Sequence, residues 1–181
     1  MGANLQDVFL KAMAMAVTAF GLLCLLKYVF KAVPRFWGAA FRTGFDFLIW
    51  AVLQIMLNLA FLASYVFYVK NGADIKLADL GVAFIAVSAV GFYLAWRLGA
   101  LERGIVTLLP AAAYGGFLLY RFFVAGTGLG FFGYVVYNPM FAFIGSGIRS
   151  EKPALAALSA LLPLACSAIG RGLAVKSIDK S

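Results

Sequence analysis

The chain has 181 residues, of which 65% are apolar and 12% are charged, and its formal net charge is +8. A soluble domain carries roughly 45–50% apolar and about 25% charged residues, so this composition predicts an integral membrane protein. The sequence contains no His, and its seven acidic residues lie outside the centres of the apolar runs. These absences exclude haem or imidazole metal ligation and His-based proton relays.

Long apolar runs indicate how the chain crosses the membrane. Backbone groups in the hydrocarbon core must pair within the protein, and runs without strand-like alternation favour helices over a barrel. Six runs fit the roughly 17–25 residues that a membrane-spanning helix needs. They cover residues 8–30, 45–69, 80–96, 104–120, 131–148 and 154–170. We therefore expect one transmembrane domain over residues 1–181, an all-α polytopic helical bundle of about six transmembrane helices.

The segment between the first two runs predicts an interfacial amphipathic helix over residues 34–43. Pro34 suits the first position of a helix, apolar side chains share one face, and two arginines lie opposite them. Basic side chains there would meet anionic head groups, each worth about 1 kcal/mol near the surface. The candidate lipid contacts are Lys31, Arg35, Trp37 and Arg42. The same pattern also fits an elbow that fixes the angle between two spans.

The distribution of Lys and Arg bears on orientation. With six spans, one side carries Lys27, Lys31, Arg35, Arg42, Arg97, Arg103, Arg149 and Lys152. The other side carries Lys11, Lys70, Lys76, Arg121, Arg171, Lys176 and Lys180. Because early positive charge dominates orientation, we expect both termini outside the cytoplasm of a bacterial-type inner membrane. If residues 131–148 re-enter the membrane instead of crossing it, the C-terminal tail changes sides.

Neutral polar residues inside the spans are candidates for a functional site. Gln54 and Asn58 are four residues apart and share a helical face, where their amides need partners or a wet cavity. They fit hydrogen bonds between helices, worth roughly 0.6–2 kcal/mol each, or coordination of a substrate or ion. Asn138 precedes Pro139 and interrupts the fifth run, which fits either a kink or the broken helix of a transport site.

Small residues recur at helical spacing in the third and fourth runs. Such residues let helices approach closely in lipid. The candidate helix-packing surface comprises Gly91, Ala95, Gly99, Ala112 and Gly116. Because only residues 97–103 separate the two runs, we expect an antiparallel hairpin that packs tightly through this surface. The same surface also suits a partner subunit.

Charged residues near the span ends are interpreted as interfacial. Lys27 can extend to the membrane surface from the end of the first span. Asp46 lies within helical reach of Arg42, and Glu102 adjoins Arg103. We expect both acids to form exposed ion pairs, because an exposed carboxylate lacks the burial that adapts an acid to catalysis.

The inventory of reactive groups favours no enzyme. There is no H-E-x-x-H, no G-x-S-x-G, no paired intramembrane Asp and no acidic cluster for Mg²⁺. Gly128, Gly130 and Gly133 match G-x-G-x-x-G, but the βαβ context that gives this motif its mechanism is missing. We therefore expect no cofactor and no metal. The scattered Lys and Arg residues predict contact with anionic lipids and no nucleic acid.

Two functions remain. The first is a non-catalytic integral membrane subunit that docks into a larger membrane complex, or into a homo-oligomer, through small-residue helix faces. The second is a small-molecule or ion transport component. Ala12-x-x-x-Ala16 is similar to the small-residue motif of the substrate-binding components of energy-coupling-factor vitamin transporters, which the chain also resembles in length and span count. That resemblance implies a transmembrane partner and cytoplasmic termini, the opposite of the charge count.

Overall fold

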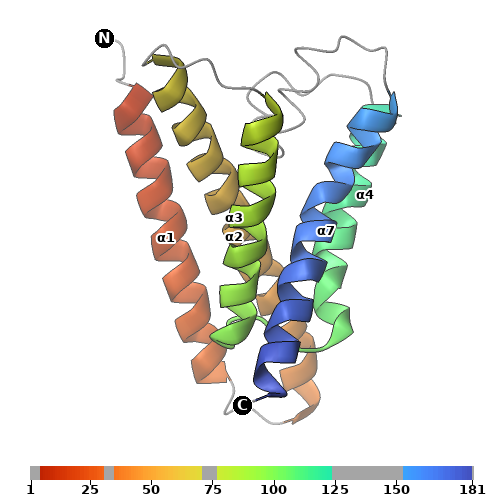
Figure 1. Ribbon diagram of the computed structural model, residues 1–181. Coiled ribbons are helices and arrows are strands. Elements are labelled where there is room, and N and C mark those ends of the chain that lie inside the picture. The colour runs from red at the N-terminus through yellow and green to blue at the C-terminus, as the bar shows by residue number, and fades with distance from the viewer. Residues whose placement is uncertain (1–4, 31–34, 71–76, 124–152, 181) are drawn as a thin grey trace.

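The computed structural model describes residues 5–30, 35–70, 77–123 and 153–180, which form helices and the loop at residues 98–104 and contain no strand. The elements in chain order are α1 (Leu5–Phe30), α2 (Arg35–Lys70), α3 (Leu77–Arg97), the 3₁₀ helix η1 (Ile105–Leu108), α4 (Leu109–Phe123) and α7 (Pro153–Ile178). They lie side by side in one bundle (Figure 1). The predicted all-α fold is confirmed for these residues.

Three of the described helices are long and apolar enough to cross a membrane. These stretches are Leu10–Val29 in α1, Phe41–Ser64 in α2 and Ala160–Ile178 in α7. Two shorter apolar stretches are Val82–Arg97 and Ile105–Tyr120. The predicted span at residues 131–148, and with it Asn138, lies outside the described residues.

The second helix is longer than the sequence indicated. α2 runs without a break over 36 residues, so residues 35–43 form its first turns, and a separate interfacial helix is not confirmed. The reason is that α2 contains no Pro, and its glycines each cost only about 1 kcal/mol in a helix. Arg35 and Trp37 therefore belong to α2, whereas Lys31 lies outside the described residues.

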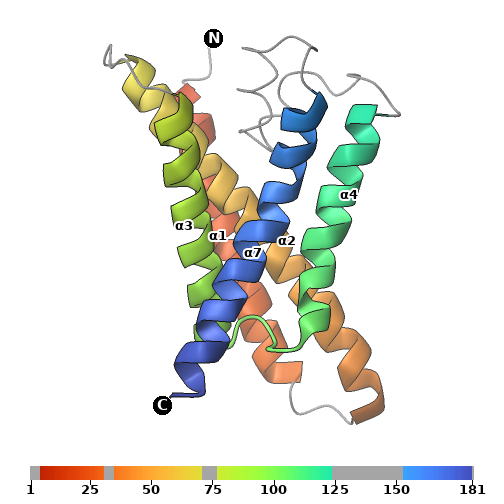
Figure 2. The ribbon, with the colours of Figure 1, turned by 45° about the vertical axis from the view of Figure 1, so that its right-hand side comes forward.

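α7 lies between α3 and α4 and packs against both of them, while α1 packs against α2 (Figure 2). A Cβ atom on Gly170 of α7 would lie 2.7 Å from the carbonyl oxygen of Ala89 and 2.8 Å from the Cβ of Phe92 on α3. A Cβ atom on Gly115 of α4 would lie 3.1 Å from the carbonyl oxygen of Ala160 on α7. The expected tight packing of the third span on the fourth is therefore wrong, because α7 occupies that position.

The predicted packing residues have different surroundings. Gly91 faces Leu57 of α2, and Ala95 is buried in the core. Gly99 has a φ of +74° and follows the end of α3, so it serves the turn and not a helix contact. Ala112 and Gly116 are exposed on α4.

The direction of the helices also differs from the expectation. The contacts of Cys166 with Ile85 and of Gly170 with Ala89 show that α7 runs parallel to α3. α1 runs in this direction too, and α4 ends at the end of the bundle where α7 begins (Figure 1). The end of α7 therefore lies beside the end of α1, so the expectation that both termini share one side is wrong. The charge count had assigned the basic residues of α7 to the opposite side.

Aromatic rings form the centre of the core. Trp50 of α2 stacks on Phe92 of α3, with ring centroids 5.7 Å apart, and meets Tyr114 of α4 edge-on at 5.5 Å. Phe92 also contacts Trp96, with centroids 6.0 Å apart. In lipid, such van der Waals and ring contacts hold helices together in place of the hydrophobic effect.

Candidate functional site

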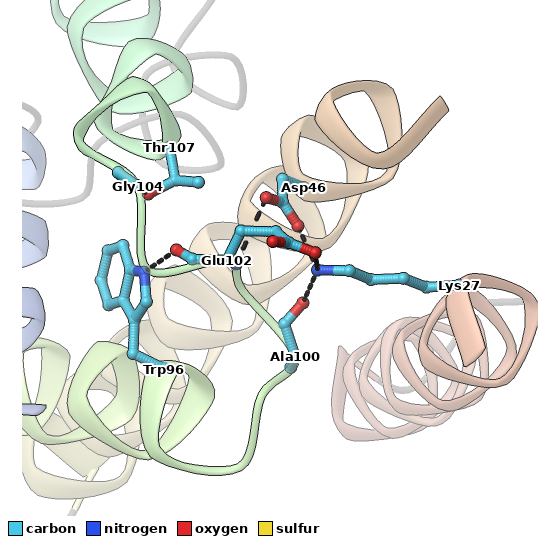
Figure 3. Close-up of polar contacts among 7 residues, drawn as sticks. All are labelled: Lys27, Asp46, Trp96, Ala100, Glu102, Gly104 and Thr107. Carbon is cyan, nitrogen blue, oxygen red and sulfur yellow. Dashed lines mark hydrogen bonds and ion pairs between the residues drawn. The ribbon is translucent and has the colours of Figure 1, made fainter. Parts of the chain in front are cut away.

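A buried ion pair joins α1 to α2 near one end of the bundle. The ammonium group of Lys27, in the last turn of α1, contacts the carboxylate of Asp46 on α2. Lys27 is 3% exposed and Asp46 is 2% exposed. The Lys27 Nζ also donates to the carbonyl oxygen of Ala100 at 2.9 Å (Figure 3). Buried charges are tolerated when they are paired and hydrogen-bonded in this way.

The loop after α3 completes this cluster. The backbone N–H of Glu102 donates to Asp46 Oδ2 at 3.3 Å, and its carbonyl oxygen accepts a hydrogen bond of 2.8 Å from Trp96 Nε1. The Glu102 carboxylate lies 3.9 Å from Lys27 Nζ, and the side chain is 42% exposed. We call Lys27, Asp46 and Glu102 the charged cluster (Figure 3).

The cluster corrects the expectation for Lys27 and Asp46. Lys27 does not extend to the membrane surface, and Asp46 is not exposed, because each is buried against the other. The partners are 19 residues apart, and Ala100 is 73 residues from Lys27, so no local motif marks the site. The sequence did contain one indication of this pair. Lys27 lies near the end of the first predicted span and Asp46 near the start of the second, so both occur at the same end of two consecutive helices.

A pocket of about 270 Å³ opens beside the charged cluster. Its lining comes from the first turns of α2, the loop after α3, η1 and the start of α4. The lining residues are Arg42, Thr43, Asp46, Glu102, Gly104, Val106, Thr107 and Pro110. Thr107 Oγ1 donates to the carbonyl oxygen of Gly104 at 2.5 Å, which fixes the first turn of η1. Arg42, predicted as a lipid contact, therefore lines a pocket that also contains two carboxylates.

The predicted amide pair lies in the interior of the bundle. Gln54 and Asn58 are both buried, and Gln54 Nε2 donates to Asn58 Oδ1 at 2.9 Å. Within the described part of the chain, Gln54 Oε1 has no hydrogen-bond partner, and neither does the buried hydroxyl of Ser88 on α3. Gln54 thus retains an acceptor that a hydrogen-bond donor can use.

A further question is whether the described residues could hold a metal ion. Among them, no three His, Cys, Asp or Glu residues lie together in a way that could hold a metal ion. No family of proteins, no curated protein and no solved structure matches this chain. We therefore infer function from the geometry of the described residues.

Proposed function

We propose that this chain is a non-catalytic integral membrane subunit that docks through the outer face of α1. Ala14, Thr18 and Gly21 follow one another at the i, i+4, i+7 spacing of one helical face, and all three are exposed. A Cβ atom on Gly21 would meet no described neighbour within 4 Å. Small outward-facing residues let a second membrane helix approach closely, and this face carries the proposal.

Two further features support docking at this face. The opposite side of α1 packs against α2, and only 6% of the span Leu10–Val29 is buried within the described protein. The hydroxyl of Thr18 donates to the carbonyl oxygen of Ala14 at 2.8 Å, so its proton is satisfied within α1. The exposed side chains of Met15 and Leu22 flank the small residues and would contact a partner helix that approaches them.

Co-purification in mild detergent tests this proposal. Leucine at Gly21 would keep a partner helix from approaching closely, so we expect Gly21→Leu to release a partner that the unaltered chain retains at fixed stoichiometry. Ala86→Leu is the matched control, because it adds bulk at an exposed small residue of α3. Docking at α1 would be contradicted if the unaltered chain purified as a lone monomer. It would also be contradicted if both variants retained the partner equally.

The second candidate function is a small-molecule or ion transport component. The unpaired, buried Gln54 Oε1 favours it, because packing alone leaves that acceptor unused. Gln54→Leu combined with Asn58→Leu separates the candidates. Loss of uptake with intact assembly supports transport, whereas loss of assembly supports a packing role. Ala12 and Ala16, which carry the resemblance to the vitamin-transporter motif, are half-buried and therefore do not lie on the exposed face of α1.

We further propose that the end with the charged cluster faces the cytoplasm of a bacterial-type inner membrane. The support comes from the basic residues at the two ends of α1, α2, α3, α4 and α7 and in the loop after α3. The described basic residues near that end are Lys27, Arg35, Arg42, Arg97, Arg103, Arg171, Lys176 and Lys180. Those toward the opposite end are Lys11, Lys70 and Arg121. An excess of Lys and Arg is typical of the cytoplasmic side.

A further inference from the structure

We propose that the pocket beside the charged cluster binds the head group of a phospholipid that carries both a phosphate and a primary ammonium group. Arg42 and Glu102 both line the pocket, so its wall includes a basic residue and a partly exposed acidic one. A guanidinium group matches the geometry of a phosphate, and a carboxylate accepts hydrogen bonds from an ammonium group. The two charges therefore suit a zwitterion.

The hydrogen bonds of the cluster assign separate roles to its two acids. Asp46 is occupied on both carboxylate oxygens, by Lys27 and by the backbone N–H of Glu102. The Glu102 carboxylate is farther from Lys27, at 3.9 Å, and its side chain is 42% exposed. Lys27 thus compensates Asp46, and Glu102 is the acid that can accept a hydrogen bond from a ligand. The hydroxyl of Thr107 donates to Gly104, so its oxygen also remains an acceptor.

The surroundings of the pocket favour a lipid over a soluble zwitterion. Ile105, Val106 and Leu109 are each more than half exposed beside the opening, where acyl chains can cover them. Arg42 and Asp46 lie near the start of the span Phe41–Ser64, at the depth where head groups meet the hydrocarbon core. The volume of about 270 Å³ is below the roughly 300–1,000 Å³ of sites that enclose drug-sized ligands. It suits a head group whose chains stay outside.

Native mass spectrometry of the full chain in detergent tests the proposal. The probes are phosphatidylethanolamine, phosphatidylcholine and phosphatidylglycerol with identical acyl chains. The first two differ in the methyl groups that remove the ammonium N–H donors. Because a hydrogen bond between charged groups is lost, we expect phosphatidylethanolamine to be retained about tenfold over phosphatidylcholine. Glu102→Gln should reduce that preference several-fold, because a neutral amide oxygen replaces the charged acceptor.

The variant and its control separate binding from folding. Glu102 ties the loop to Asp46 and Trp96 through its backbone N–H and carbonyl, which Glu102→Gln leaves in place. Asp179→Asn removes an exposed acid at the end of α7 and should keep the preference. Since the pocket is distinct from the outer face of α1, Gly21→Leu should keep it too, whatever its effect on docking.

Four results would overturn the proposal. They are equal retention of the ethanolamine and choline lipids, an undiminished preference in Glu102→Gln, stronger retention of phosphatidylglycerol, and displacement of the lipid by an equal concentration of phosphoethanolamine. The third result would show attraction to net charge alone. The fourth would show that the acyl chains contribute nothing, so the ligand would be a soluble zwitterion.

Discussion

The indole N–H of Trp50 donates a hydrogen bond of 3.1 Å to the hydroxyl of Ser167, and both residues are buried. This bond links α2 to α7 over a separation of 117 residues. The same indole ring stacks on Phe92, so Trp50 of α2 contacts both α3 and α7. A buried indole N–H needs a partner, and Ser167 supplies it.

Replacing Ser167 should therefore loosen the bundle. We expect Ser167→Ala to lower the free energy of unfolding by about 1–2 kcal/mol, since the Trp50 N–H loses its acceptor. The hydroxyl of Ser177 donates within α7, to Ala174, so Ser177→Ala is the matched control. Unfolding in mixed micelles gives both values. If Trp50→Phe with Ser167→Ala shows strictly additive losses, the bond does not couple the helices.

The charged cluster should behave as a unit. Removing one partner of a buried ion pair leaves the other charge uncompensated, so Lys27→Met or Asp46→Leu should each destabilise the protein by about 3–5 kcal/mol. The double variant should recover a large part of that loss. Lys11→Met, which removes an exposed charge from the same helix, should have little effect. A double variant as unstable as the two losses combined would argue against a paired role.

Two glycines of α7 provide a sharp comparison. A methyl group at Gly170 would lie 2.7 Å from Ala89 O and 2.8 Å from Tyr93 N, so Gly170→Ala must push α3 and α7 apart. We expect a loss of about 1–3 kcal/mol in thermal or denaturant unfolding. Gly172→Ala meets no described neighbour within 4 Å and should be neutral or slightly stabilising. Equal effects of the two substitutions would refute the close α3–α7 contact.

Cysteine labelling tests the orientation. In a chain with Cys24→Ala and Cys166→Ala, we expect Leu98→Cys and Lys180→Cys to react with a membrane-impermeant maleimide from the cytoplasmic side. Lys11→Cys should react from the opposite side, because α1 begins at the other end of the bundle (Figure 1). Labelling of Leu98→Cys and Lys180→Cys from different sides would show that α7 does not run parallel to α3.

The sequence was sufficient for properties that depend on neighbouring residues. Run length and composition predicted helices at α1, α2, α3, α4 and α7, and the four-residue spacing placed Gln54 and Asn58 on one face. The start of α2 was predicted less well. Amphipathicity in residues 34–43 indicates which side chains share a face, but it does not show whether the helix ends before the span begins.

Contacts between distant residues were beyond what the sequence pattern could give. Gly170 resembles any glycine of an apolar helix until α3 is placed against it. Asp46 had Arg42 within helical reach, yet its buried partner Lys27 comes from another helix. Local spacing identifies which charges can meet along one helix, whereas the packing of separate helices decides which charges are buried together.

The position of α7 between α3 and α4 has a consequence for biosynthesis. A ribosome completes α3 and α4 before it translates Pro153–Ile178, so the surface around Ala89 and Phe92 forms without its final neighbour. The two earlier helices must then stay apart until α7 is made, or they must separate again when α7 arrives. The bond from the Glu102 backbone N–H to Asp46 ties the loop before α4 to α2 during that interval.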